Sequence, residues 1–330
     1  MKGPKPDKLE MKLVSGRNID PARWDHFVHE APTGSVFALH GYASAEKDWQ
    51  ACIVEDTSGW RAVMPIIARK KGGFSYVTHP PFCQFWGPIL APPISSHPYT
   101  RLSEMKKVIS LLAAHLASYT KVTTYCSPAL TYPLPFHWNH LHLHTRYTFQ
   151  LDLGVTIDRL KENLAPPLRR QVKKAINAGY ELRLGHDASY LLELIEKNRQ
   201  EGHDIVAGIP DSFERLRWIT HYLLEEEKGR VLSLWDGAEL LAAGLFAHYK
   251  GTTTYLIGSQ SPKRGASGAM SALMWEAIRQ AKVSGDHTFD FEGSMIEGVE
   301  AFFRKFGAQP VPYLQISKND LPLPIRWISG

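Results

Sequence analysis

Hydrophobic residues recur every three or four positions in two stretches of the second half, 187–202 and 211–227. This spacing predicts two amphipathic helices. Three runs rich in β-branched and aliphatic residues follow, and they are joined at Asp236-Gly237 and at Lys250-Gly251. Because such dipeptides are typical of tight turns between antiparallel strands, the runs predict a three-stranded meander.

A helix, a strand, a short helix and a last strand complete the predicted second half. Residues 268–284 carry an apolar stripe at helical spacing and end at Gly285, the usual helix stop. The strand-like run 287–292 comes next. Val299, Phe302, Phe303 and Phe306 then follow helical spacing up to Gly307, and a strand is expected near 311–317.

The first half repeats this order less clearly. Helical patterns cover residues 20–31 and 38–48, and two strand-like runs flank a turn at 57–59. An amphipathic helix over 101–119 and a strand over 121–127 follow. Two helices, a meander, a helix and a strand therefore occur twice, which is the pattern of a diverged structural duplication.

The pattern predicts an α/β (α+β) chain of two domains, each with a mixed, mainly antiparallel sheet flanked by helices. The N-terminal domain is expected over residues 1–150 and the C-terminal domain over 151–330. A basic segment, 156–179, opens the second domain and should be helical on both sides of Pro166-Pro167.

Composition fits a folded globular protein: the 330 residues are 44% hydrophobic and 22% charged, with a net charge of 38 − 33 = +5. Cys52, Cys83 and Cys126 are too few and too widely spaced for a disulfide framework or a zinc motif. No apolar run reaches the roughly 20 residues that span a bilayer. We therefore expect a cytoplasmic protein with no membrane span and no DNA partner.

Four segments carry a resemblance to a known family: 168–183, 243–261, 270–282 and 290–313. In order and motif they resemble the GNAT acyltransferase fold. The paired arrangement is similar to FemA/FemB/FemX-type aminoacyl transferases and to related GNAT-family N-acetyltransferases. The most specific feature is the strand, glycine and helix ending Phe-Arg-Lys-Phe-Gly at 303–307. The resemblance implies tandem GNAT-like domains, with the active site in the second.

Two motifs of that family differ here. The acetyl-CoA loop of GNAT enzymes reads Gln/Arg-x-x-Gly-x-Gly/Ala, whereas this chain has Arg264 one residue out of register before Gly265 and Gly268. Many GNAT enzymes also place a tyrosine on the last helix as general acid. Phenylalanines occupy this helix here, so that role cannot be carried over.

Asp290 and Glu292 are the leading candidates for catalysis. They share one face of the strand that ends there, opposite Phe289 and Phe291. Two carboxylates at a strand end can hold an amine and accept its proton, with Glu292 ranked first. The alternative is that both bind backbone amides and basic side chains. Tyr255, on the third meander strand, is expected to orient substrate.

Other polar residues in and before the short helix that ends at Gly307 have structural interpretations. Ser294 and Glu297 match a capping box, and Glu300 and Arg304 match a surface ion pair. Lys305 corresponds to a cation that, in the Fem-type ending, is thought to contact the donor or the reacting carbonyl. A cation in the last turn also complements the helix dipole without any function.

Two basic segments are candidates for binding anions. The loop before the helix at 268 is basic and rich in glycine, which suits phosphate binding at a helix N-terminus, or else a solvated loop. The second segment is a run of cations in 156–179 that suits a phosphate-bearing acceptor or tRNA, or else a solvated helix face. The loop residues are Lys263, Arg264, Gly265, Ser267 and Gly268, and the helix residues are Arg169, Arg170, Lys173 and Lys174.

His140, His142 and His144 recur at strand spacing, but no cysteine or carboxylate completes a ligand set, so no metal is expected. The sequence thus favours an acyltransferase that moves an acyl group from an acyl-CoA-type thioester, its co-substrate, to a small-molecule or peptide amine. One alternative is a Fem-like enzyme that uses aminoacyl-tRNA and acts on a cell-wall precursor peptide. A second is a catalytically inactive GNAT-like binding protein.

Overall fold

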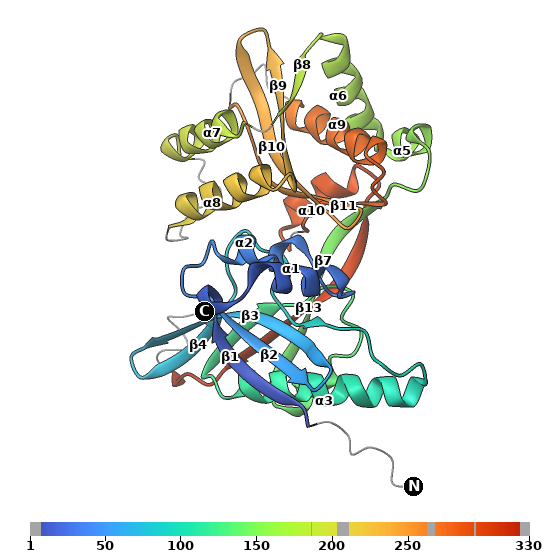
Figure 1. Ribbon diagram of the computed structural model, residues 1–330. Coiled ribbons are helices and arrows are strands. Elements are labelled where there is room, and N and C mark those ends of the chain that lie inside the picture. The colour runs from blue at the N-terminus through green and yellow to red at the C-terminus, as the bar shows by residue number, and fades with distance from the viewer. Residues whose placement is uncertain (1–7, 186, 203–210, 263–267, 294, 324–330) are drawn as a thin grey trace. The chain divides into compact units, whose positions relative to one another are not determined.

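The computed structural model describes residues 8–185, 187–202, 211–262, 268–293 and 295–323. The chain forms two compact units (Figure 1). Unit 1 comprises residues 1–146 and 312–330, and unit 2 comprises residues 147–311. The described residues 312–323, which the sequence pattern assigned to the C-terminal domain, therefore group with unit 1.

Unit 1 contains a sheet in the order β1-β2-β3-β4-β6-β13, with β5 paired to β3. All neighbours are antiparallel except β4 and β6, which run parallel. Its elements are β1 (Glu10–Ser15), α1 (Pro21–Glu30), α2 (His40–Ala43), β2 (Gln50–Asp56), β3 (Gly59–Lys71), β4 (Phe74–Thr78), β5 (Ile89–Leu90), α3 (Pro98–Ala117), β6 (Lys121–Tyr125) and α4 (Leu134–Trp138).

Unit 2 contains a sheet in the order β7-β12-β11-β10-β9-β8, in which β11 and β12 form the parallel pair. Figure 1 shows α6 and α9 together on one face of this sheet, with α7 and α8 on the other. Its elements are β7 (His142–Asp152), α5 (Ile157–Asn163), α6 (Pro166–Asn177), β8 (Glu181–Gly185), α7 (Ser189–Gln200), α8 (Ser212–Glu225), β9 (Gly229–Asp236), β10 (Glu239–Tyr249), β11 (Thr252–Gln260), α9 (Ala269–Val283), β12 (Thr288–Asp290) and α10 (Glu297–Arg304). The last strand, β13 (Gln309–Asn319), pairs with β6 in the sheet of unit 1.

The two units repeat one order of elements, as the duplication predicted. Each has a strand, two helices, a three-stranded meander, a long helix and a strand parallel to the meander's last strand. Each sheet then takes its next strand from the other half of the chain. β7 follows the N-terminal elements but pairs with β12, and β13 follows the C-terminal elements but pairs with β6.

Each unit has its own hydrophobic core. In unit 1, α3 buries Ile109, Leu112 and Leu116 against β2, β3 and β6. In unit 2, the core is formed by α6, α9 and α10 against the sheet, and it includes Phe289, Phe291, Phe303 and Phe306. Val299 and Phe302 pack against this core, so the aromatic stripe predicted for the last helix is confirmed. Among the described residues, no helix is both long and apolar enough to cross a membrane.

Several local predictions are wrong. Residues 38–48 form only the four-residue α2, after a 3₁₀ turn over Val36–Ala38. Asp211 precedes α8 but makes no capping hydrogen bond, because its backbone is left-handed, with φ of 54°. The capping box also fails: α10 starts at Glu297 after Ile296, so Glu297 is the first residue of the helix and not the third. Ser294 lies outside the described residues.

Candidate functional site

β11 and β12 separate near Asp290 and Glu292, the two acidic residues predicted to be catalytic. They pair from Thr252/Thr288 only to Thr254/Asp290, while β11 continues to Gln260 beside β10. The register between β10 and β11 also shifts here: Leu245 pairs with Ile257 and Phe246 with Tyr255. Leu256 is therefore a bulge residue, which bends the strand and increases its twist. The sheet of unit 2 opens beyond Thr254 on the side of β12.

The backbone turns sharply after β12 through two left-handed residues. Glu292 has φ of 61° and Gly293 has φ of 56°. A Cβ atom at Gly293 would lie 2.4 Å from the carbonyl oxygen of Tyr147 and 2.5 Å from Cα of Thr148, so only glycine fits. Glu292 is not a glycine, so its left-handed backbone conformation is not explained in this way. A non-glycine residue in this conformation costs roughly 1–3 kcal/mol and is most often retained at functional sites.

Asp290 fixes this turn. Its side chain is 2% exposed. One carboxylate oxygen accepts hydrogen bonds from Oγ1 of Thr148 at 2.5 Å and from the backbone N–H of Glu292 at 2.8 Å. The other accepts one from Nε2 of Gln150 at 2.8 Å. Asp290 thus holds the backbone of Glu292, and its lone pairs are largely used for that purpose.

The carboxyl group of Glu292 lies in a different environment. Burial, and secondarily the negative charge of Asp290, raises the pKa of Glu292 well above its ordinary value of 4.5. Tyr255 is close enough that the charge of Glu292 adds to burial in raising the pKa of the Tyr255 hydroxyl. The structure therefore brings three of the four predicted catalytic residues, Glu292, Asp290 and Tyr255, to the point where the strands part.

The side chain of Tyr255 is partly buried and packs against the core of unit 2. Its ring contacts Phe246 at 5.5 Å between centroids. Its hydroxyl lies over Gly258, where a Cβ would come within 2.6 Å of the phenolic oxygen. Gly258 therefore makes room for this tyrosine.

Lys305, the fourth predicted catalytic residue, lies apart from this group. It caps the C-terminus of α10 and its side chain is exposed. Its backbone carbonyl accepts a hydrogen bond from the N–H of Ala165, which ties α10 to the start of α6. Among the residues that the structure describes, no hydrogen bond or ion pair joins its ammonium group to Glu292 or Tyr255.

The N-terminus of α9 lies against α6. Gly268 precedes the helix with φ of 85° and makes no side-chain cap. A Cβ at Gly268 would be 3.4 Å from Cβ of Gln171 on α6, and Ser271 donates a hydrogen bond to Oε1 of Gln171 at 3.2 Å. The predicted phosphate residues Lys263, Arg264, Gly265 and Ser267 lie outside the described residues.

The four cations of α6 do not act alike. Arg169 donates hydrogen bonds from its guanidinium to the carbonyl oxygens of Glu162 and Leu164, at 2.6 and 3.1 Å, and so caps α5. Arg170, Lys173 and Lys174 are exposed. Arg170 and Lys174 flank Gln171, the residue that contacts α9. Of the predicted loop, only Gly268 is described, and it lies beside this basic helix.

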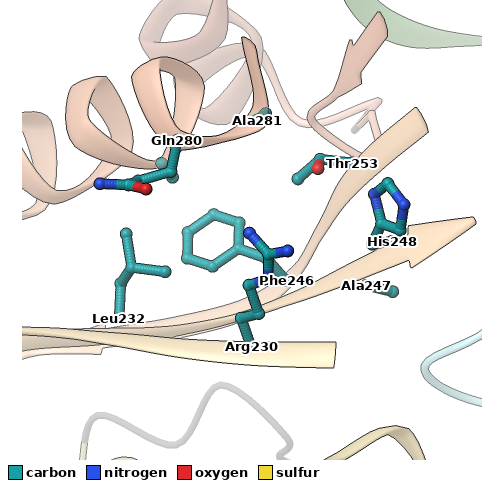
Figure 2. Close-up of a pocket in the computed structure, with 9 residues that line it drawn as sticks. Arg230, Leu232, Phe246, Ala247, His248, Thr253, Gln280 and Ala281 are labelled. Atoms are coloured by element: carbon teal, nitrogen blue, oxygen red, sulfur yellow. The ribbon is translucent and has the colours of Figure 1, made fainter. Parts of the chain in front are cut away.

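A solvent-open hollow of about 300 Å³ lies under the C-terminal half of α9, away from Glu292. Figure 2 shows Gln280 and Ala281 on its helix side and the ring of Phe246 on its strand side. At its edge, His248 and Thr253 both hydrogen-bond to the buried carboxylate of Asp286. These contacts join the end of α9 to β10 and β11, which accounts for the polar residues structurally.

No group of three or more potential metal ligands occurs among the described residues. His140 has a left-handed backbone between α4 and β7, with φ of 61°. His142 and His144 lie on β7 with ring centroids 6.4 Å apart, and His144 hydrogen-bonds to Ser317.

The sequence reasoning missed Thr148 and Gln150, the partners of Asp290. A signal was present, because residues 146–152 alternate polar and apolar side chains along β7. The histidines at strand spacing before them were considered only as metal ligands, and the alternation that follows was not used.

The order of the meander and the parting of β11 from β12 are features of the GNAT fold. Residues 167–304 match the family described as acetyltransferase (GNAT) domain. This part of the chain is therefore similar to a GNAT acetyltransferase domain. No curated protein sequence matches the chain.

Solved structures show the same tandem fold over nearly the whole chain. The crystal structure of FemX superposes with a TM-score of 0.65 at 12% identity, covering 92% of this chain and 96% of FemX. L-PGS from Bacillus licheniformis gives 0.55 at 15% identity, with 94% and 95% covered. A tandem GNAT protein from the clavulanic acid biosynthesis pathway gives 0.51 at 12% identity, with 95% and 99% covered. The tandem GNAT-like fold expected from the sequence is confirmed.

Proposed function

We propose that the protein transfers an acyl group from an acyl-CoA-type thioester to an amine, with Glu292 as the general base. The observation that carries this proposal is the half-buried Glu292 beside Tyr255, at the point where β11 and β12 part. An ammonium group must lose a proton before its nitrogen can attack a thioester carbonyl. A carboxylate whose pKa is raised toward neutrality accepts that proton efficiently.

In this mechanism Asp290 is a positioning residue and not a second base. Its oxygens accept hydrogen bonds from Thr148, Gln150 and the backbone of Glu292. Its fixed negative charge helps to raise the pKa of Glu292. Tyr255 supplies a hydroxyl near the same carboxyl, where it orients the substrate or returns a proton to the leaving thiolate. The tetrahedral intermediate needs a hydrogen-bond donor, and a backbone N–H of β11 beyond Thr254, where β12 no longer pairs with this strand, would suit that need.

The donor's phosphates are proposed to bind at the start of α9. Helix N-termini favour anions because their first N–H groups are unpaired. Arg170 and Lys174 on α6 flank the residue that contacts Gly268 and would add two positive charges. This assigns these cations to an acyl-CoA donor, whereas the sequence alone suggested a phosphate-bearing acceptor or tRNA. Lys263, Arg264, Gly265 and Ser267 remain predicted contributors, as does Lys305 for the donor or the reacting carbonyl.

A second candidate function keeps the fold and changes the donor to an aminoacyl-tRNA, with a cell-wall precursor peptide as acceptor. Its support is the FemX-like fold over most of the chain together with the basic face of α6. A third candidate is an inactive GNAT-like binding protein.

Thermal unfolding with each donor separates the candidates. Because a ligand that binds only the native state raises its stability, acetyl-CoA is expected to raise Tm, and Arg170→Ala with Lys174→Ala should reduce that rise. A rise with aminoacyl-tRNA but none with acetyl-CoA would favour the Fem-like function instead. Binding of either donor without transfer to any amine in a broad panel would favour the inactive protein.

A further inference from the structure

Four large apolar side chains are exposed where α3 meets α4 in unit 1. Tyr99 is 76% exposed and Trp138 is 48% exposed, and Leu102 and Leu134 are each about half exposed. We call these four residues, together with Lys106, the α3–α4 face. Single exposed apolar residues are common, but a contiguous group that includes Trp and Tyr marks an interaction surface.

The members of this face are neighbours in space. Tyr99, Leu102 and Lys106 are spaced three and four residues apart on α3, the long teal helix of Figure 1, and so share one side of it. The ammonium of Lys106 lies 4.7 Å from the centroid of the Trp138 ring, which joins this side to α4. Leu134 lies one turn before Trp138 on the same side of α4. The face is therefore continuous across both helices.

Cations outnumber acids along the part of the chain that contains the face. From residue 57 to residue 151 the chain has nine Lys and Arg but a single acid, Glu104, for a net charge of +8. The whole chain has +5, so the remainder carries −3. Glu104 is engaged, because its carboxylate accepts hydrogen bonds from the backbone N–H groups of Ile94 and Ser95. Arg101 and Lys107 are exposed beside the face.

We propose that the α3–α4 face docks on the surface of a membrane rich in anionic lipid. Trp and Tyr prefer the boundary between head groups and acyl chains, and leucines insert just below it. Each nearby cation contributes about 1 kcal/mol of attraction to an anionic leaflet. RNA is a poorer partner, because Leu102 and Leu134 offer nothing to a phosphate backbone. The acceptor amine or the acylated product would then be presented at that surface.

Vesicle co-sedimentation of the full chain tests this proposal. We expect binding to vesicles of equal parts phosphatidylglycerol and phosphatidylcholine, much weaker binding to phosphatidylcholine alone, and loss of affinity as salt rises. Trp138→Ser should weaken binding to the anionic vesicles about tenfold, given the apolar area withdrawn from water. Leu102→Ser should act in the same direction. Trp218→Ser on α8 is the matched control, because Trp218 is 50% exposed and carries the same side chain outside the face.

Three results would overturn the proposal. The first is equal binding of wild type, Trp138→Ser and Trp218→Ser. The second is binding to polyuridylate RNA, lost in Trp138→Ser, without binding to vesicles. The third is a wild-type dimer in sedimentation velocity that Trp138→Ser converts to a monomer, again without vesicle binding, since that would make the face a contact between copies of this chain.

Discussion

The backbone conformation of Glu292 connects the candidate chemistry to the fold. Glu292 has a left-handed backbone between the three-residue strand β12 and the left-handed Gly293. Asp290 holds this conformation by accepting a hydrogen bond from the N–H of Glu292, and the carbonyl of Tyr147 packs closely against Gly293. The acid that is fully hydrogen-bonded positions the backbone, whereas the acid with the strongly raised pKa is suited to proton transfer. The proposed difference in role between these two nearby carboxyls thus follows from the difference in their environments.

Replacing Asp290 with Asn should move the acidic limb of the pH–rate profile to lower pH. The negative charge of Asp290 raises the pKa of Glu292, and Asn removes that charge while retaining an oxygen for Thr148 and the Glu292 N–H. A base works when deprotonated, so a lower pKa extends activity toward acid. The profile of kcat/KM against pH measures this shift. Asp152→Asn, an exposed change on β7, should leave the limb unchanged, and an unmoved limb in Asp290→Asn would refute the positioning role.

Glu292→Gln should stabilise the protein at alkaline pH. The native carboxyl keeps its proton above the ordinary value of 4.5, whereas the unfolded chain loses it there. Native stability therefore falls as pH rises from about that value through the raised pKa. Gln has no proton to lose, so the free energy of unfolding of the variant should exceed that of wild type more at alkaline than at acidic pH. Urea unfolding at both extremes measures this, with the exposed Glu297→Gln as control. A pH-independent difference would contradict the raised pKa.

At the scale of elements, the turn between β12 and α10 is the most constrained segment of the site. Gly293→Ala should destabilise the protein by about 1–3 kcal/mol, because alanine suits neither a φ of 56° nor the approach of Tyr147. Gly298→Ala, in the open first turn of α10, should instead be neutral or stabilising by up to about 1 kcal/mol. Chemical denaturation of both variants provides the measurement. Equal effects would mean that the turn is not held as described.

The cations of α6 should separate into structural and binding roles. Arg169→Ala removes the cap on α5 and should lower stability by about 1 kcal/mol with little change in KM for the donor. Arg170→Ala should raise that KM, less so at high salt, with stability unchanged. Unfolding curves and donor titrations of the two variants check this pair. If Arg170→Ala leaves KM unchanged, the proposed donor site at the start of α9 is wrong.

At the scale of the whole molecule, the duplicated order of elements could be predicted because each meander and its following helix carry strong periodicity and turn residues. The exchange of β7 and β13 between the two sheets could not be predicted, because pairing between strands that are far apart in the sequence leaves no local signal. The capping box failed for a related reason: the left-handed turn at Glu292 and Gly293 delays the start of α10 to Glu297. The acidic pair could be found from the alternation in β12, but its division into base and positioning residue depends on Thr148 and Gln150, about 140 residues earlier in the chain.

The most direct measurement is the rate of acyl transfer by Glu292→Gln. With acetyl-CoA as donor and a panel of amines as acceptors, release of the free thiol follows turnover of wild type and variant. Glu292→Gln should lower kcat roughly 10²- to 10⁴-fold, the usual loss when a general base is removed, while acetyl-CoA still raises Tm. A variant that turns over as fast as wild type would contradict the assignment of Glu292 as the base.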